Sequence, residues 1–148
     1  MSPYSIPSKI KSLLDLIRFD KPIGFMLLMW PCWFALAVLP GNPFLYLKWY
    51  ILFLIGSFLM RSAGCVINDL VDIKIDNKVE RTSLRPLVTK SITIPESIFF
   101  LILLLMFSFF ILIQFNFKAI IIILFSIPLI ILYPYMKRFT HWPQLFLG

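Results

Sequence analysis

Acidic residues are scarce in this chain of 148 residues, which contains 7 Asp and Glu residues against 14 Lys and Arg residues. Charged residues of both signs make up only 14% of the sequence, whereas hydrophobic residues make up 60% and the mean hydropathy is +0.92. A soluble domain of this length could not bury so much apolar surface, so the composition excludes that class. The sequence therefore predicts an integral membrane protein embedded in a lipid bilayer.

Cysteine, histidine and glycine are also rare, and their scarcity excludes several kinds of site. Cys32 and Cys65 lie in apolar stretches far from His141, the single histidine, so neither a disulfide nor a zinc site is expected. The chain has no glycine-rich phosphate loop, nucleophile elbow or metalloprotease motif. The net charge of +7 is split among short segments around apolar runs, which argues against a nucleic-acid partner.

Long apolar runs predict an all-α fold, a polytopic membrane bundle of about four transmembrane helices in a single domain over residues 1–148. Each run approaches the roughly 20 residues that a helix needs to cross the hydrocarbon core. The predicted spans are residues 23–39, 47–67, 98–115 and 119–135. A signal-peptide core is the alternative for the first run, but that run contains Pro31 and no small-residue cleavage site follows it.

The distribution of basic residues predicts the orientation of the chain in the membrane. Most Lys and Arg residues precede the first span, flank or occupy the connection 68–95, or follow the last span. Because basic loops stay on the cytoplasmic side, we place the N-terminus and the Asp-rich connection there, in a bacterial inner membrane. Within this connection, residues 82–95 are predicted to form an exposed polar loop. Thr93 and Glu96 predict the capped start of the next helix.

Four side chains that carry oxygen atoms follow the second span. Asn68, Asp69, Asp72 and Asp76 share roughly one quadrant of a helix, because residues four apart fall about 40° from each other. Three carboxylates this close repel one another unless cations lie between them. Mg²⁺ takes such oxygen ligands and bridges them to substrate phosphates, so the cluster predicts a Mg²⁺ site. A solvated, mixed-charge helix end is the alternative.

Basic residues gather near these acids in the predicted topology. They are Arg81, Arg85 and Lys90 in the same connection, and Lys137 and Arg138 after the last span. Cations beside metal-binding carboxylates suit a polyphosphate, because they cancel its charge as a leaving group. Lys137 also shares a helix face with Tyr133, four residues earlier. The alternative is that these bases set only the orientation in the membrane.

The segment from Asn68 to Asp76 resembles the first Asp-rich motif, NDxxDxxxD, of the membrane-embedded aromatic prenyltransferases. The resemblance continues in other stretches, in the same order as in the family. These are Asp20-Lys21-Pro22-Ile23-Gly24, Trp30-Pro31, residues 81–87 and residues 133–144. Within the family, they are most similar to the members that prenylate 4-hydroxybenzoate in ubiquinone biosynthesis.

The resemblance implies a reaction and a role for each matching residue. The reaction is transfer of a polyprenyl group from polyprenyl diphosphate to the ring of 4-hydroxybenzoate. The implied roles are Mg²⁺ ligation by Asn68, Asp69, Asp72 and Asp76, catalysis by Asp72 and Asp76, diphosphate binding by Arg81, Arg85 and Lys137, and lining of the substrate pocket by Tyr133 and Arg138. Arg138 would face the carboxylate of the benzoate.

The sequence departs from the family pattern in one respect. The family has about nine spans and a second Asp-rich motif, whereas Glu96 is the single acidic residue after position 80 here. The chain therefore resembles the N-terminal half of a nine-helix bundle. It could be a truncated and inert membrane fragment, one half of a split enzyme that pairs with a C-terminal half, or a half that self-associates. A phosphatidyl- or glycosyltransferase is the alternative enzyme class.

Overall fold

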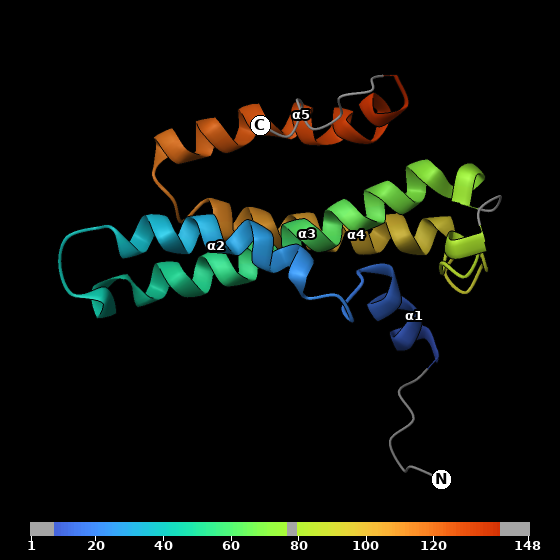
Figure 1. Cartoon of the computed structure of the whole chain (residues 1–148), viewed down its shortest axis with the longest axis horizontal. Coiled ribbons are helices and arrows are strands. Elements are labelled where there is room, and N and C mark those ends of the chain that lie inside the picture. The colour runs from blue at the N-terminus through green and yellow to red at the C-terminus, as the bar shows by residue number, and fades with distance from the viewer. Residues whose placement is uncertain (1–7, 77–79, 140–148) are drawn as a thin grey trace, which may run out of the picture. The chain divides into compact units, whose positions relative to one another are not determined.

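A computed structural model describes residues 8–76 and 80–139 of the chain (Figure 1). Within these ranges, the side chains of residues 74, 75, 81 and 129–139 lie outside the description. The described residues form helices joined by turns and contain no strand. The chain divides into two compact units, Met1–Ser108 and Phe109–Gly148.

The described part of the chain contains five α-helices and two short 3₁₀ helices. In order, they are α1 (Ser8–Leu16), α2 (Ile23–Ala37), η1 (Pro43–Tyr46), α3 (Leu47–Asp76), η2 (Glu80–Thr82), α4 (Ile94–Leu112) and α5 (Phe117–Phe139). The predicted all-α class is confirmed. The helix α3 continues beyond the predicted span 47–67 and includes the whole Asp-rich segment.

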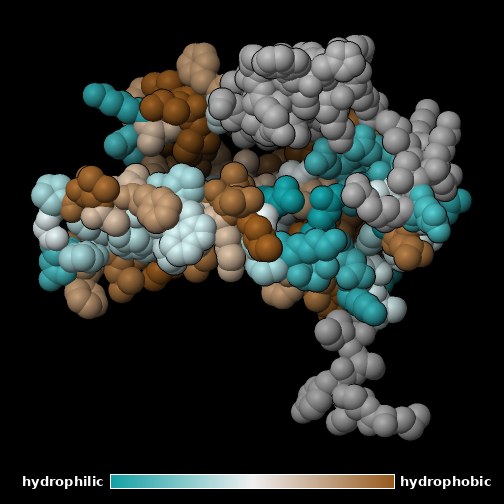
Figure 2. Space-filling view, viewed as in Figure 1, coloured by the Kyte–Doolittle hydropathy of each residue, from teal (hydrophilic) through white to brown (hydrophobic). Residues whose placement is uncertain are grey.

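Apolar side chains on the surface of the helices are the mark of a membrane bundle. On α4, Phe99, Ile102 and Phe107 are 64%, 56% and 52% exposed, and brown apolar residues cover much of the surface in Figure 2. Such a surface is too apolar for water and suits lipid. Two segments, Pro43–Ile73 and Ile94–Leu112, are long and apolar enough to cross a bilayer. The apolar helix Ile23–Ala37 is shorter, and so is Phe117–Pro128, the part of α5 whose side chains are described. The count of four spans stays a prediction.

The helices α2 and α3 form an antiparallel hairpin in the first unit (Figure 1). The turn between them needs Gly41, whose φ of +115° favours glycine. Asn42 begins η1, where its side chain accepts a hydrogen bond of 3.0 Å from the Phe44 backbone N–H. The Trp33 indole N–H donates to the Tyr50 carbonyl oxygen at 3.1 Å, which joins the two helices near the turn.

The core of the first unit lies at the other end of α3. It is built from Leu16, Ile17, Ala63, Val66, Leu87, Ile92 and Leu104, which belong to α1 and the residue after it, α3, α4 and the connection before α4. The predicted exposed loop over residues 82–95 is therefore wrong in part. Leu87 and Ile92 are buried because their apolar side chains complete this core, which draws the connection onto α3.

The start of α4 has the predicted capping box. The Glu96 carboxylate accepts a hydrogen bond of 2.9 Å from the Thr93 backbone N–H, and the Glu96 backbone N–H donates to the Thr93 hydroxyl at 3.4 Å. Glu96 also forms an ion pair with Lys9 of α1. The cap thus fixes where the helix begins.

Replacement of Thr93 by alanine is expected to lower the free energy of unfolding by about 1 kcal/mol, because it removes the cap. The measurement is unfolding of the chain in detergent, followed by circular dichroism. Thr93→Ser keeps the hydroxyl and serves as the control. Equal loss of stability in both variants would contradict the capping role.

Candidate functional site

The carboxylates of the Asp-rich segment lie near the C-terminal end of α3. Asp69, Asp72 and Asp76 are 2%, 8% and 6% exposed, so their side chains face the interior of the first unit. Asp69 and Asp76 are seven positions apart and share one face of the helix, and both pair with the same arginine. That all three carboxylates act as one site stays a prediction. The alternative of a solvated helix end is excluded for these side chains, because they are buried.

Two arginines from outside α3 form ion pairs with Asp69 and Asp76. Arg85 donates through Nη1 to Asp69 Oδ1 at 3.0 Å and also to Asp76 Oδ2. Arg18 donates through Nη2 to the same oxygen of Asp69 at 2.8 Å. Buried carboxylates require such paired charges. The sequence predicted that cations would lie beside these carboxylates. In this structure, the guanidinium groups of Arg18 and Arg85 lie beside Asp69 and Asp76.

The backbone at the end of α1 directs Arg18 towards α3. Arg18 has a φ of 56°, in the left-handed region that residues with a side chain seldom adopt. This conformation closes the helix: the Phe19 backbone N–H donates to the Leu14 carbonyl oxygen at 3.0 Å. A strained residue persists where surrounding contacts determine it, and the ion pair with Asp69 is such a contact.

The connection after α3 holds Arg85 in place. The Thr82 hydroxyl donates to the Asp76 carbonyl oxygen at 3.0 Å, which ties the connection to the end of α3. Further along, the backbone N–H groups of Val88 and Thr89 donate to the Arg85 carbonyl oxygen at 2.9 and 3.0 Å. Burial of Leu87 anchors this turn in the core. The folded connection therefore brings a guanidinium group to acids 9 and 16 residues earlier.

A polar pocket of about 570 Å³ opens beside the ion pairs. Its charged lining residues are Asp15, Arg18, Asp20, Lys21, Arg61, Asp69 and Arg85. Figure 2 shows hydrophilic residues gathered around α1 and the C-terminal part of α3. Several cations around one opening can hold an anion such as a phosphate group.

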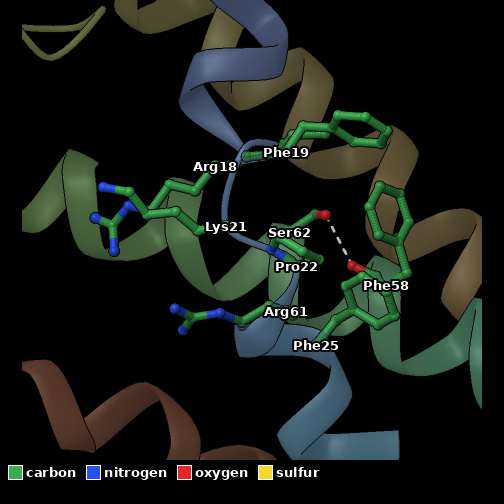
Figure 3. Close-up of a pocket in the computed structure, with 9 residues that line it drawn as sticks. Arg18, Phe19, Lys21, Pro22, Phe25, Phe58, Arg61 and Ser62 are labelled. Atoms are coloured by element: carbon green, nitrogen blue, oxygen red, sulfur yellow. Dashed lines mark hydrogen bonds between the residues drawn. The ribbon is translucent and has the colours of Figure 1, made fainter.

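A second pocket, which we call the aromatic pocket, lies between the α1–α2 connection and α3 (Figure 3). Its volume is about 370 Å³. Three of its lining residues, Arg18, Lys21 and Arg61, also line the polar pocket. The two pockets are therefore neighbours that share three cations, whereas Arg85 lines only the polar pocket.

The chemistry of Asn68 fits a hard cation. Its Oδ1 atom is buried and accepts no hydrogen bond from any described residue. A buried acceptor without a partner is costly, and an amide oxygen is a ligand that Mg²⁺ and Ca²⁺ accept. Among residues 8–76 and 80–139, no group of three or more His, Cys, Asp or Glu residues is placed to hold a metal ion. The amide and carboxylate oxygens of this segment are ligands that suit Mg²⁺. In this structure, the carboxylates of Asp69 and Asp76 pair with arginines.

Other residues predicted for the site are not brought into it by the described structure. Tyr133, Lys137 and Arg138 belong to α5 in the second unit, and their side chains lie outside the description. The side chain of Arg81 in η2 is also outside the description. Their predicted roles in binding diphosphate and substrate stay predictions.

Sequence reasoning did not assign Arg18, Lys21 and Arg61 to the site. All three were explained as residues that set the orientation in the membrane. A signal was present for Lys21, which belongs to the stretch Asp20-Lys21-Pro22-Ile23-Gly24 that resembles the family. For Arg61, the signal was a charged residue within a long apolar helix, which tends to mark function.

Comparison with known proteins decides the family. The model of the UbiA prenyltransferase family matches residues 28–148, which include the Asp-rich segment of α3. This chain belongs to the UbiA prenyltransferase family. The predicted resemblance to membrane-embedded prenyltransferases is therefore confirmed.

Curated relatives within the UbiA family are named as 4-hydroxybenzoate prenyltransferases. The mitochondrial 4-hydroxybenzoate polyprenyltransferase of Dictyostelium discoideum is 46% identical over 144 residues, which cover 96% of this chain and 31% of that protein. The 4-hydroxybenzoate octaprenyltransferase of Vibrio vulnificus is 45% identical over 95% of this chain and 49% of its own length. The mitochondrial 4-hydroxybenzoate polyprenyltransferase of Caenorhabditis elegans is 48% identical over 97% of this chain and 41% of its own length.

This UbiA family chain thus spans between about a third and a half of the length of these relatives. No solved structure matches it. The geometry of its site therefore rests on the ion pairs and pockets of the chain itself.

Proposed function

We propose that this chain forms the diphosphate-binding part of a Mg²⁺-dependent transferase that prenylates 4-hydroxybenzoate in ubiquinone biosynthesis. The observation that carries the proposal is the buried pair of Asp69 and Asp76, neutralised by Arg18 and Arg85 beside a polar pocket of about 570 Å³. The names of the relatives support the choice of substrates.

The cations of the polar pocket suit the departure of diphosphate. Arg18 and Arg85 would pair with the diphosphate oxygens and offset the negative charge that grows as the group leaves. The bond between the allylic carbon and the diphosphate oxygen breaks, and its electron pair leaves with diphosphate. The ring carbon beside the hydroxyl of 4-hydroxybenzoate forms the new carbon–carbon bond and then loses its proton to water or diphosphate. No oxidant or reductant is needed.

Asn68 and the acidic residues of α3 are proposed to bind Mg²⁺ together. Asn68, Asp69, Asp72 and Asp76 supply the oxygen donors that the ion prefers, and Asp72 and Asp76 act as catalytic residues in this scheme. Bound Mg²⁺ would add positive charge that stabilises the leaving diphosphate. The oxygen atoms needed for this role are buried on α3 within one unit of the chain.

Residues of the connection and of α5 complete the proposed binding surface. We assign diphosphate contacts to Arg81 and Lys137 alongside Arg85, and places in the substrate pocket to Tyr133 and Arg138. These assignments follow from the family motif rather than from side-chain positions.

The chain is an integral membrane protein, and we propose a bacterial inner membrane with the N-terminus and the Asp-rich end of α3 on the cytoplasmic side. The positive charges around that end support this orientation. Because the chain spans at most about half of its relatives, we also propose that activity requires their remaining part or a second copy of this chain.

Prenyl transfer in membranes that lack their own enzyme tests the proposal. We expect labelled 4-hydroxybenzoate to be prenylated when the chain is supplied with polyprenyl diphosphate, Mg²⁺ and the C-terminal half of a relative. Chelation of Mg²⁺ should abolish the product. Product without the added half would indicate self-association. Absence of product in every case, with the chain shown to be inserted, would overturn the proposal in favour of an inert fragment.

A further inference from the structure

One guanidinium group bridges two buried carboxylates that lie about two turns apart on α3. Arg85 Nη1 donates to Asp69 Oδ1 at 3.0 Å and also to Asp76 Oδ2. Asp69 Oδ1 accepts a second hydrogen bond, of 2.8 Å, from Arg18 Nη2. Asp69 and Asp76 are 2% and 6% exposed. At such burial, a carboxylate that loses its partner needs another positive charge in its place.

The bridge joins groups to which the proposed function assigns other partners. Asp69 and Asp76 are proposed ligands of Mg²⁺, and Arg85 is a proposed contact of the diphosphate. A divalent cation on these carboxylates would lie close to the guanidinium group, and like charges repel strongly in a partly buried site. The two carboxylates therefore favour either the arginine or the metal ion.

The backbone on both sides of Arg85 is anchored independently of its guanidinium group. Before it, the Thr82 hydroxyl donates to the Asp76 carbonyl oxygen at 3.0 Å. After it, Leu87 is buried in the core, and the Val88 N–H donates to the Arg85 carbonyl oxygen at 2.9 Å. The Arg85 side chain is 24% exposed and lines the polar pocket. Its guanidinium group can thus turn from the carboxylates into the pocket while the connection stays in place.

Other cations of the polar pocket are not committed to a carboxylate. Lys21 and Arg61 line this pocket, and none of the ion pairs among the described residues involves either of them. Figure 3 shows their side chains extending to the same side as that of Arg18. An anion in the pocket can therefore meet Arg61 without breaking an ion pair, whereas it must take Arg85 from two acids. Arg61 is the matched comparison for Arg85.

We propose that Arg85 competes with the metal ion for Asp69 and Asp76, which keeps the site from binding a divalent cation or a diphosphate tightly on its own. The proposal rests on the proposed function, from which it takes the two ligands. When both are present, the carboxylates pass to the metal ion and Arg85 passes to the diphosphate. Each buried charge then keeps a partner throughout. The site therefore takes the two ligands together.

Competition of this kind couples two binding events, and the coupling acts in both directions. Removal of the guanidinium group should strengthen the binding of a cation. Removal of a carboxylate from the bridge should strengthen the binding of an anion in the absence of metal, because Arg85 is then held by one acid fewer. A carboxylate that acts only as a metal ligand would oppose the anion through its charge alone.

Binding of Mn²⁺ alone to the whole chain in detergent tests the first direction, with the free ion measured by electron paramagnetic resonance. We expect Arg85→Gln to bind Mn²⁺ about tenfold more tightly than wild type. Arg61→Gln makes the same change in the same pocket without breaking an ion pair, and its effect should be clearly smaller. Arg85→Lys keeps the charge but loses the fork that spans both acids, so it should also strengthen binding. A general charge effect predicts no change in Arg85→Lys.

Binding of labelled inorganic pyrophosphate in the presence of EDTA tests the second direction. We expect Asp76→Asn to bind pyrophosphate about tenfold more tightly than wild type. Asp15→Asn is the control, because Asp15 is an exposed acid that lines the same pocket and takes part in none of the ion pairs among the described residues. Circular dichroism checks that each variant folds. If Arg85→Gln does not fold, Arg85→Lys and Asp76→Asn still test the competition.

Two results would overturn the competition. One is unchanged affinity for Mn²⁺ and pyrophosphate in the folded variants, and the other is an equal effect in each variant and its control. The transfer assay separates this failure from that of the proposed function. Product formation together with unchanged affinities would reject the competition and keep the function. The expected shifts without any product would keep the competition and reject the function, whereas binding of neither ligand by any variant would overturn both.

Discussion

Replacement of Arg85 by alanine is expected to destabilise the chain by about 3 kcal/mol, at the low end of the range for breaking a buried ion pair. The variant leaves Asp76 without this guanidinium partner and leaves Asp69 with Arg18 alone. Partial exposure of the Arg85 side chain keeps the cost from being larger. Unfolding in detergent and prenyl transfer in membranes measure the two effects, and transfer should be lost.

Two further variants show whether the loss arises from the ion pairs. Arg85→Lys keeps the charge but cannot reach both carboxylates as a guanidinium fork does, so its stability should lie between wild type and Arg85→Ala. Lys11→Met removes an exposed cation of α1 and should change neither measurement. Adding Asp76→Asn to Arg85→Ala should cost less than the sum of the single changes. Full additivity would show that the two side chains are not coupled.

Replacement of Asp72 by asparagine should separate activity from stability. We expect prenyl transfer to fall about 10²- to 10³-fold, which is the usual cost of losing one group that stabilises charge in a transition state. Stability should change much less than activity, because asparagine keeps the size of the side chain and one of its oxygen acceptors. Initial rates with saturating Mg²⁺ and the supplied C-terminal half, together with unfolding in detergent, measure both.

The exposed acid Glu80 of η2 provides the matched control for Asp72. Glu80→Gln removes the same charge near the end of α3 and should retain full transfer. Equal rates for Asp72→Asn and wild type would contradict a role for this carboxylate in the reaction. A parallel loss of stability and activity would instead show that Asp72 acts through the fold.

The spacing of residues on α3 made the acidic face predictable. Asn68, Asp72 and Asp76 recur every four residues, and the helix places such residues on one side wherever it lies. Thr93 and Glu96 were predictable for the same reason, because a capping box involves residues three apart. Both predictions depend on contacts within one segment.

The pairing of Arg18 with Asp69 was not predictable in this way. The two residues are 51 positions apart, and their contact depends on how α1 ends and packs against α3. The burial of Leu87 and Ile92 was also missed, because two apolar residues in a polar stretch show no periodicity. Their place in the core follows from the packing of several elements around them.

By itself, the sequence determined the membrane class, the long apolar helices and the face of α3 that carries the acids, because composition and helical periodicity are properties of short segments. It did not predict α1, which is short and not apolar throughout. Only the tertiary structure decided which cations reach those acids and which side chains form the aromatic pocket. Arg61 illustrates the difference: its position depends on the absence of a side chain at Gly24 of the neighbouring helix. Contacts between distant segments arise from packing, and burial then makes the pairing of each charge obligatory.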